Sequence, residues 1–178
     1  MTNPKTPEND PGSEMGYRPC VGLLVLNEKG EIWVGQRIDT PGDSEGRGTW
    51  WQMPQGGIDE GEEPKDAALR ELFEETGMRT VELIDELEDW LFYDLPPHLL
   101  GKAWGGRYRG QRQRWYAIRF NGPDSEINIV PADPANREFN TWRWAAADEV
   151  INLIVPFKRE VYEQVLARFR PLLGTSAP

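Results

Sequence analysis

The residues best suited to chemistry lie in one acidic segment, Gly56–Met78, which reads GGIDEGEEPKDAALRELFEETGM. On a helical wheel at about 100° per residue, Glu71, Glu74 and Glu75 gather on one side, at spacings of three and four. The apolar residues gather on the other side, at Ala68, Leu69, Leu72 and Phe73. Three carboxylates on one helix face repel one another, and hard oxygen donors without nearby histidine or cysteine suit Mg²⁺ or Mn²⁺. The alternative is a solvated acidic helix face.

The pattern around the three glutamates resembles the Nudix box, G-x5-E-x7-R-E-U-x-E-E-x-G-U, where U is a bulky apolar residue. Every defined position is filled, by Gly56, Glu62, Arg70, Glu71, Leu72, Glu74, Glu75, Gly77 and Met78. The resemblance implies hydrolysis of a nucleoside diphosphate linked to another group. It assigns Mg²⁺, or Mn²⁺ or another divalent cation in its place, to Glu71, Glu74 and Glu75. It gives structural roles to Gly56, Glu62, Arg70 and Gly77.

The likeness extends over most of Tyr17–Phe169, in the segments YRPCVGLLVLN, WQMPQGGIDEGE, YDLPP, GQRQRWY, EFNTWRW and VPFKREVYE. These segments are similar to the subfamily of RNA pyrophosphohydrolases and plant-type diadenosine tetraphosphate hydrolases. By this resemblance Glu138 completes the metal site or acts as the base. Glu74, Glu75 and Glu138 are all candidates for the catalytic carboxylate that accepts the proton.

Basic residues are concentrated between Leu95 and Pro123, a stretch without Asp or Glu that carries Lys102, Arg107, Arg109, Arg112, Arg114 and Arg119. In an acidic chain this local inversion favours a surface that meets phosphates; the alternative is a basic face that balances acidic neighbours. Arg112 and Arg114 are favoured over Arg119 because alternate residues of an extended segment point the same way.

The resemblance also implies the remaining contacts with substrate. Arg18 and Arg37 match arginines that bind the polyphosphate, and Tyr93, Val155 and Phe157 match positions that pack on a nucleobase. For these apolar positions the alternative is an ordinary place in the core. Trp50 and Trp51 are weaker stacking candidates. The lone His98 and Cys20 are expected to take no part in catalysis.

The elements that must position these residues alternate between strands and helices. Extended segments are predicted at 18–26, 31–37, 81–93, 114–121 and 141–145, and helices at 64–76 and 159–169. Pro64 and Gly77 suit the start and the end of the first helix. The fold class is therefore α/β (α+β), and the resemblance implies the Nudix fold, a mixed β-sheet sandwiched between α-helices. Flexible tails are predicted at 1–16 and 173–178, one domain at 17–172, and a polar glycine-rich loop at 39–48.

Composition narrows the class of protein further. The chain has 178 residues, 20 Lys and Arg against 30 Asp and Glu, and a net charge of −10, which argues against a protein that coats DNA or an anionic membrane by bulk charge. A single histidine excludes multi-histidine zinc sites and disfavours a histidine-based triad. The longest apolar run, Val21–Leu26, is too short to span a bilayer. We expect a soluble cytoplasmic protein with no membrane or DNA partner.

The function predicted from these observations is metal-dependent hydrolysis of a phosphoanhydride. The first hypothesis is an RNA pyrophosphohydrolase that removes pyrophosphate from the 5′-triphosphate end of RNA and so starts mRNA decay. The second is a diadenosine tetraphosphate, or dinucleoside polyphosphate, hydrolase. The third is a non-catalytic nucleotide-binding module, which would be expected to lack some carboxylates of the box. Oligomeric state, protein partners and the number of metal ions stay open.

Overall fold

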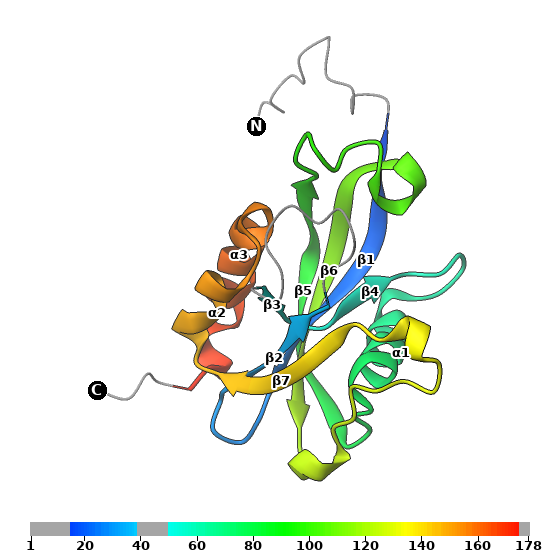
Figure 1. The fold of residues 1–178 in the computed structure, drawn as a ribbon. Coiled ribbons are helices and arrows are strands. Elements are labelled where there is room, and N and C mark those ends of the chain that lie inside the picture. The colour runs from blue at the N-terminus through cyan, green and yellow to red at the C-terminus, as the bar shows by residue number, and fades with distance from the viewer. Residues whose placement is uncertain (1–14, 39–49, 175–178) are drawn as a thin grey trace.

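The central strand of the fold is β1 (Gly16–Leu26), in which every residue from Cys20 to Leu26 is buried. A continuous buried run of this kind requires cover on both faces of the sheet. The computed structural model describes residues 15–38 and 50–174, and its strands form one mixed sheet with helices on both faces (Figure 1).

The sheet has the order β3-β2-β1-β6-β5, with β4 paired to β1 and β7 paired to β2. Only the pair of β1 and β6 is parallel among the described strands; the other pairs are antiparallel. The strands are β2 (Ile32–Arg37), β3 (Trp51–Gln52), β4 (Gln55–Gly57), β5 (Val81–Asp94), β6 (Tyr108–Phe120) and β7 (Phe139–Ala145).

The sheet divides into two arms beyond a single point of contact. β1 pairs with β2 only at Leu26 and Ile32, and β1 then pairs with β4 through Cys20, Val21 and Gly22. β2 continues instead with β3 and β7. The segment Trp51–Gly57 crosses from one arm to the other, and the Leu23 N–H donates to the Pro54 carbonyl at 2.9 Å within this crossing. The crossing brings the start of the acidic segment to the place where the arms separate.

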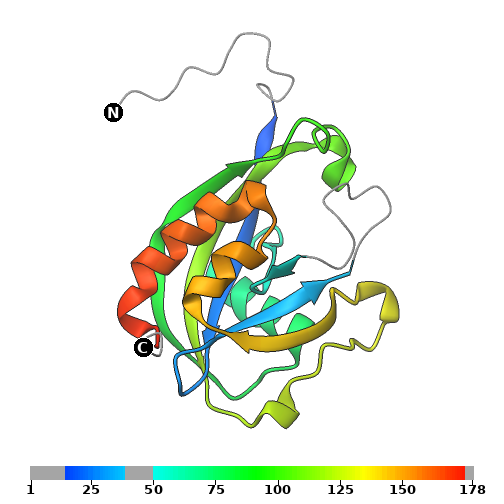
Figure 2. The ribbon, with the colours of Figure 1, turned by 60° about the vertical axis from the view of Figure 1, so that its left-hand side comes forward.

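Alternating residues of β1 build two separate hydrophobic layers. Val21, Leu23 and Val25 pack in the layer of α1 (Pro64–Thr76), while Leu24 and Leu26 pack in the layer of α2 (Ala147–Leu153) and α3 (Arg159–Phe169). Figure 2 shows α2 and α3 in front of the sheet and α1 behind it. The predicted mixed sheet sandwiched between helices is confirmed.

Several boundaries differ from the sequence predictions. The helices at 64–76 and 159–169 have the predicted bounds, but the short helix α2 was not predicted. β6 begins at Tyr108, six residues before the predicted start, because its first half alternates polar and glycine residues that carry no apolar signal. β1 begins at Gly16, at the edge of the predicted N-terminal tail. Residues 1–14 and 175–178 of the predicted tails, and the loop predicted at 39–48, lie outside the described residues.

Within the described part of the chain, the longest apolar helix falls short of what a membrane crossing requires.

Gly22 is expected to be intolerant of any side chain. A Cβ atom at this position would lie 2.6 Å from Cδ2 of the buried Trp115, and overpacking of this kind destabilises a core by about 1–3 kcal/mol. Gly22→Ala should lower the free energy of unfolding, measured by chemical denaturation, by that amount. Gly16→Ala on the same strand is the control, because a Cβ there meets nothing within 4 Å. Equal stability of the two variants would contradict the close contact.

Candidate active site

The acidic face is carried by α1, whose ends are defined as the sequence suggests. Pro64 occupies the first turn, and Gly77 adopts the left-handed conformation with φ 71°, which glycine tolerates best. Its N–H donates to the Phe73 carbonyl at 2.8 Å. The helix buries Ala67, Ala68 and Leu72 against the sheet, whereas Phe73 is 43% exposed. Phe73, placed on the apolar side of the wheel, therefore lies at the rim of the helix.

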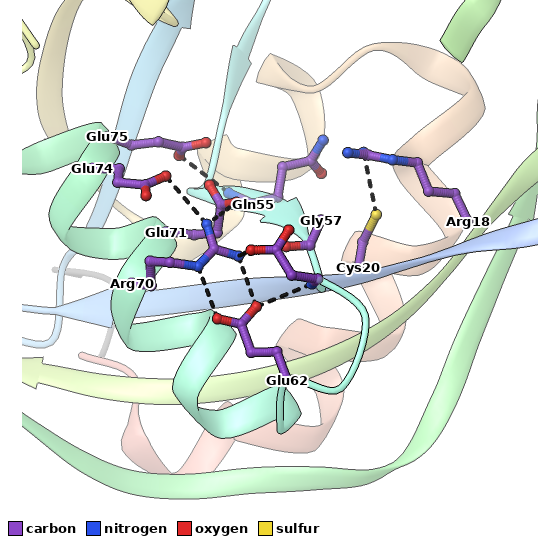
Figure 3. A network of polar contacts seen from close by, with 10 residues as sticks. Arg18, Cys20, Gln55, Gly57, Glu62, Arg70, Glu71, Glu74 and Glu75 are labelled. Carbon is purple, nitrogen blue, oxygen red and sulfur yellow. Dashed lines mark hydrogen bonds and ion pairs between the residues drawn. The ribbon is translucent and has the colours of Figure 1, made fainter. Parts of the chain in front are cut away.

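Arg70 connects the helix to the loop that precedes it. Its guanidinium donates to both carboxylate oxygens of Glu62, at 2.9 and 2.8 Å, and to the Gly57 carbonyl at 2.9 Å. A bidentate pair of this kind fixes orientation as well as charge. The hydrogen bonds from Arg70, followed by the Asp59 N–H, lower the pKa of Glu62 to about 2. Figure 3 shows the Arg70 guanidinium among these contacts. The hydrogen bonds with Glu62 raise the pKa of Arg70 in turn.

The same guanidinium also reaches the acidic face. Arg70 Nη1 lies 2.9 Å from Glu71 Oε1 and 3.3 Å from Glu74 Oε2. Glu71 is 15% exposed and Glu74 is 55% exposed. Burial raises the pKa of Glu71, and the neighbouring charges of Glu74 and Glu138 add to this effect, while Arg70 opposes it. Arg70 is thus the cation that offsets part of the repulsion among the glutamates.

Two glycines of β4 make room at the site. A Cβ atom at Gly56 would overlap the carboxylate of Glu71, and one at Gly57 would lie 2.6 Å from Arg18 Nη2. The absence of side chains lets the helix carboxylate and the strand arginine approach the β4 backbone from its two sides. The structure therefore gives Gly56 a direct physical role at the carboxylate of Glu71.

Glu75 is the most deeply placed carboxylate, with 8% of its surface exposed. Its Oε2 accepts a hydrogen bond from the Gln55 N–H at 3.3 Å. Burial raises the pKa of Glu75 well above its ordinary value, and the charges of Glu138 and Glu71 raise it further. Glu138 is exposed and directly precedes β7. Its charge contributes to the raised pKa of both Glu71 and Glu75, so it belongs to the same electrostatic cluster.

The donor set fits a hard divalent cation, although the side chains do not surround one as they lie. Among residues 15–38 and 50–174, no three His, Cys, Asp or Glu side chains are grouped closely enough to hold a metal ion. The chemistry nevertheless matches, because the oxygens are carboxylates. Burial, and then the repulsion between neighbouring carboxylates, raises the pKa of Glu71 and Glu75. A cation would relieve that repulsion and compete with Arg70 for Glu71 and Glu74.

A cavity of about 350 Å³ opens beside Glu71 and Glu75 where the two arms of the sheet separate. Its cations are Arg18 from β1, Arg37 from β2 and Lys158, which directly precedes α3. Its remaining lining residues are Gln52, Gln55, Gly56, Gly57, Trp104, Gln111 and Glu138. Carboxylates and cations that line the same cavity suit a polyphosphate accompanied by a divalent cation.

Half of the residues that line this cavity were not predicted as site residues from the sequence, among them Lys158 and Trp104. Lys158 is 6% exposed, and its Nζ lies 5.7 Å from the ring centre of Tyr93. The signal for it was its position next to Phe157 in VPFKR. Trp104 contacts the Arg18 guanidinium, whose Cζ lies 5.7 Å from the Trp104 ring centre. No pattern in the sequence marked Trp104, because it lies in an irregular segment and has a positive φ of 51°.

Arg112 and Arg114 do not line this cavity. In the register of the sheet, Arg18, Gln111 and Tyr93 lie side by side, and Arg18 and Gln111 line the cavity. Residues one position further along each strand face the opposite side of the sheet. Both arginines accordingly lie over the ring of Trp90, with Cζ at 4.4 Å for Arg112 and 5.6 Å for Arg114. They share a face, as predicted, but not the face of the cavity.

The three positions proposed to hold a nucleobase have different surroundings. The rings of Tyr93 and Phe157 lie 5.7 Å apart, beside the Lys158 ammonium. Phe157 is partly exposed, Tyr93 is 7% exposed, and Val155 is only 1% exposed. Phe157 can therefore contact a ligand as it lies, whereas Val155 is part of the hydrophobic layer of α2 and α3.

A second cavity, of about 720 Å³, lies on the other side of the glutamates. Glu71, Glu75 and Glu138 line both cavities. Its other lining residues are Phe73, Glu74, Gly77, Asn128, Val130, Pro131, Ala132, Asp133 and Asn136. This lining contains no basic residue, in contrast to the first cavity.

The comparisons with known proteins agree on one family. A model of the NUDIX domain matches residues 16–165. An RNA pyrophosphohydrolase of Brucella abortus (strain 2308) is 58% identical over 165 residues, which cover 92% of this chain and 92% of the relative. One of Brucella anthropi is 56% identical over 167 residues, covering 93% and 95%.

Solved structures show the same fold at low identity. The E. coli dihydroneopterin triphosphate pyrophosphohydrolase aligns with a TM-score of 0.62 at 18% identity, covering 86% of this chain and 99% of the other. A binary complex of a C. elegans Ap4A hydrolase aligns with a TM-score of 0.59 at 19% identity, covering 85% and 98%.

The ion pair between Arg70 and Glu62 should give stability that depends on pH. Because the folded-state pKa of Glu62 is lowered to about 2, its contribution is present above the ordinary glutamate pKa and is lost as pH falls toward that value. Glu62→Gln should therefore destabilise the protein near neutral pH, and the difference in unfolding free energy from the unchanged protein should shrink in acid. Glu163→Gln, an exposed change on α3, is the control. A difference that stays constant with pH would refute the ion pair.

Proposed function

The chain belongs to the NUDIX domain family, and we propose that it is a Mg²⁺-dependent RNA pyrophosphohydrolase acting on the 5′-triphosphate end of RNA. The observation that carries the proposal is the cavity in which Arg18, Arg37 and Lys158 face Glu71 and Glu75. The relatives that are named RNA pyrophosphohydrolase and match over nine-tenths of the chain support the choice of RNA.

The carboxylates prepare the site for the attacking water. Glu71, Glu74, Glu75 and Glu138 would hold the divalent cation. When bound, that cation neutralises polyphosphate charge and lowers the pKa of a water molecule. Gly56 leaves the space into which the Glu71 carboxylate fits. Arg70 would keep its contacts with Glu62 and the Gly57 carbonyl, and so hold the helix to the preceding loop, while Glu71 and Glu74 release it to bind the cation.

The reaction needs one proton acceptor. Water adds to phosphorus, the bond between phosphorus and the bridging oxygen breaks, and pyrophosphate leaves with that oxygen. A carboxylate takes the proton of the water. Glu74, Glu75 and Glu138 are the candidates. Burial, together with the charges of Glu138 and Glu71, raises the pKa of Glu75 and makes it a stronger proton acceptor than an ordinary glutamate.

The cations of the cavity hold the phosphates and the leaving group. Arg18 is positioned by Trp104 and by the bare backbone of Gly57, and Arg37 approaches from the other arm of the sheet. Their charges stabilise the negative charge that develops on the leaving pyrophosphate. The partly exposed ring of Phe157, next to Tyr93, would stack against a nucleobase at the 5′ end.

A dinucleoside polyphosphate is the second candidate substrate. It presents the same phosphoanhydride but carries a nucleoside at each end. The specific observation in its favour is the cavity of about 720 Å³ beyond the glutamates, which is large enough for a second nucleoside and has no basic lining.

Removal of the buried carboxylate should abolish turnover with little change in fold. Glu75→Gln keeps the shape of the side chain, and we expect kcat for triphosphorylated RNA in Mg²⁺ to fall at least about a hundredfold. Labelled product analysis measures the rate, and Mn²⁺ binding measured by calorimetry should weaken in parallel. Glu163→Gln serves as the control. Full activity of folded Glu75→Gln would overturn the assignment of Glu75.

Arg18→Ala should slow hydrolysis of both candidate substrates, because each presents a polyphosphate to this arginine. We expect kcat/KM to fall at least about tenfold, on the scale of one lost charge-assisted contact, for triphosphorylated RNA and for diadenosine tetraphosphate alike. Arg170→Ala, an exposed change after α3, is the control. Side-by-side specificity constants of the unchanged protein decide the main substrate, and faster cleavage of the dinucleotide would overturn the RNA proposal.

A further inference from the structure

The face of the sheet behind the cavity carries a group of aromatic and arginine side chains that the proposed reaction does not use. We call it the aromatic–arginine face, and it consists of Tyr17, Trp90, Phe92, Arg109, Arg112 and Arg114. These residues come from three adjacent strands, β1, β5 and β6. The sequence motif GQRQRWY, whose arginines were expected to meet phosphates, contributes Arg112 and Arg114 here.

The register of the strands places this face directly behind the floor of the cavity. Pro19, Arg112 and Phe92 form one row across the three strands. The adjacent row consists of Arg18, Gln111 and Tyr93, of which Arg18 and Gln111 line the cavity. The two surfaces are thus opposite sides of the same strands, offset by one residue.

Arginine and aromatic side chains alternate on this face in direct contact. Arg112 Cζ lies 4.4 Å from the Trp90 ring centre, within the range of a cation–π interaction. Arg114 lies over the same ring at 5.6 Å and is 3.9 Å from a carboxylate oxygen of Glu86. In the described residues Arg112 makes no ion pair with a carboxylate. Its charge is therefore available to an anion from outside.

The second half of the face offers an exposed ring. Phe92 is 52% exposed, the most exposed large hydrophobic side chain among the described residues. The Tyr17 ring meets it edge-on at 5.0 Å. Arg109 lies 5.3 Å from the Tyr17 ring centre and pairs with Asp94 at 3.1 Å. These contacts hold the Tyr17 ring in place beside Phe92.

We propose that the aromatic–arginine face binds the single-stranded body of an RNA whose 5′ end occupies the cavity. Sheet faces that present aromatic rings and arginines recognise single-stranded nucleic acid, because unpaired bases stack on the rings and phosphates meet the cations. This inference rests on the proposed function for its choice of RNA.

Charge favours a nucleic acid over an apolar partner. The chain has a net charge of −10, yet three arginines gather on this face within a stretch of β6 free of Asp and Glu. Glu86 and Asp94 on β5 offset two of these charges. The resulting affinity is modest and depends on salt, with base stacking on Phe92 and Trp90 as its second component.

The test compares substrates of different length. For the unchanged protein, KM for triphosphorylated unstructured RNA should be lower for long oligonucleotides than for a triphosphorylated dinucleotide, which is too short to leave the cavity. Phe92→Ala should raise KM for the long RNA at least about fivefold, on the scale of one lost base stack, and leave the dinucleotide unaffected. Arg112→Ala should also reduce the slope of affinity against salt by about 0.7, and Arg112→Lys should restore it.

Arg168→Ala is the matched control. Like Arg112, Arg168 contacts an aromatic ring, Phe169, but it lies on the other side of the sheet, where it pairs with Asp85 of β5. Arg168→Ala should leave KM unchanged for both the long RNA and the dinucleotide. A loss of turnover with the dinucleotide in Phe92→Ala or Arg112→Ala would overturn the proposal, as would equal KM values for long and short RNA.

A binding measurement separates this proposal from the proposed function. RNA with a 5′-hydroxyl end cannot be hydrolysed at a 5′ phosphoanhydride, yet fluorescence anisotropy should detect its binding, weakened by Phe92→Ala and Arg112→Ala. Single strands should bind better than a duplex, since stacking needs unpaired bases. Absence of this binding refutes the RNA surface even if the enzyme is active, and its presence in an enzyme inactive on RNA would count against the proposed function alone.

Discussion

The side chain of Arg70 is the interaction on which the rest of the site depends. One guanidinium joins Glu62 and the Gly57 carbonyl of the loop to Glu71 and Glu74 of the helix. Without this cation, the carboxylates of the helix would repel one another without compensation. The repulsion would be strongest next to the sheet, where the dielectric constant is low. The arrangement keeps the acidic face intact and anchored to the strand that forms the wall of the cavity.

The local parts of the structure were predictable because their causes are local. Proline and glycine mark the ends of α1, and the spacing of its glutamates fixes the face they share. The side of the sheet on which Arg112 and Arg114 lie was not predictable, since alternation shows only that they point together, and the register with β1 decides the direction. Trp104 and Lys158 reach the cavity from irregular segments, for which sequence periodicity gives no signal. The short helix α2 offers too few turns to show a period.

The separation of the sheet into two arms explains why one cluster of glutamates borders two cavities. Where β1 leaves β2, the short strand β4 lies beside β1 instead, and its Gly56 and Gly57 leave bare backbone next to Glu71 and Arg18. The carboxylates of Glu71 and Glu75 therefore reach through from one layer to the other. A basic lining on one side and an uncharged or acidic lining on the other gives the two sides different ligand preferences.

Lys158 lines the cavity and directly precedes α3, which packs in one of the two hydrophobic layers. Its ammonium lies with the rings of Tyr93 and Phe157, and α3 begins at the next residue. An anion that binds beside this ammonium binds the folded state, in which α3 holds Val161, Val165 and Phe169 in the core. Occupancy of the cavity and docking of α3 are consequently linked equilibria, so that a bound anion protects from unfolding a helix whose core residues it never touches.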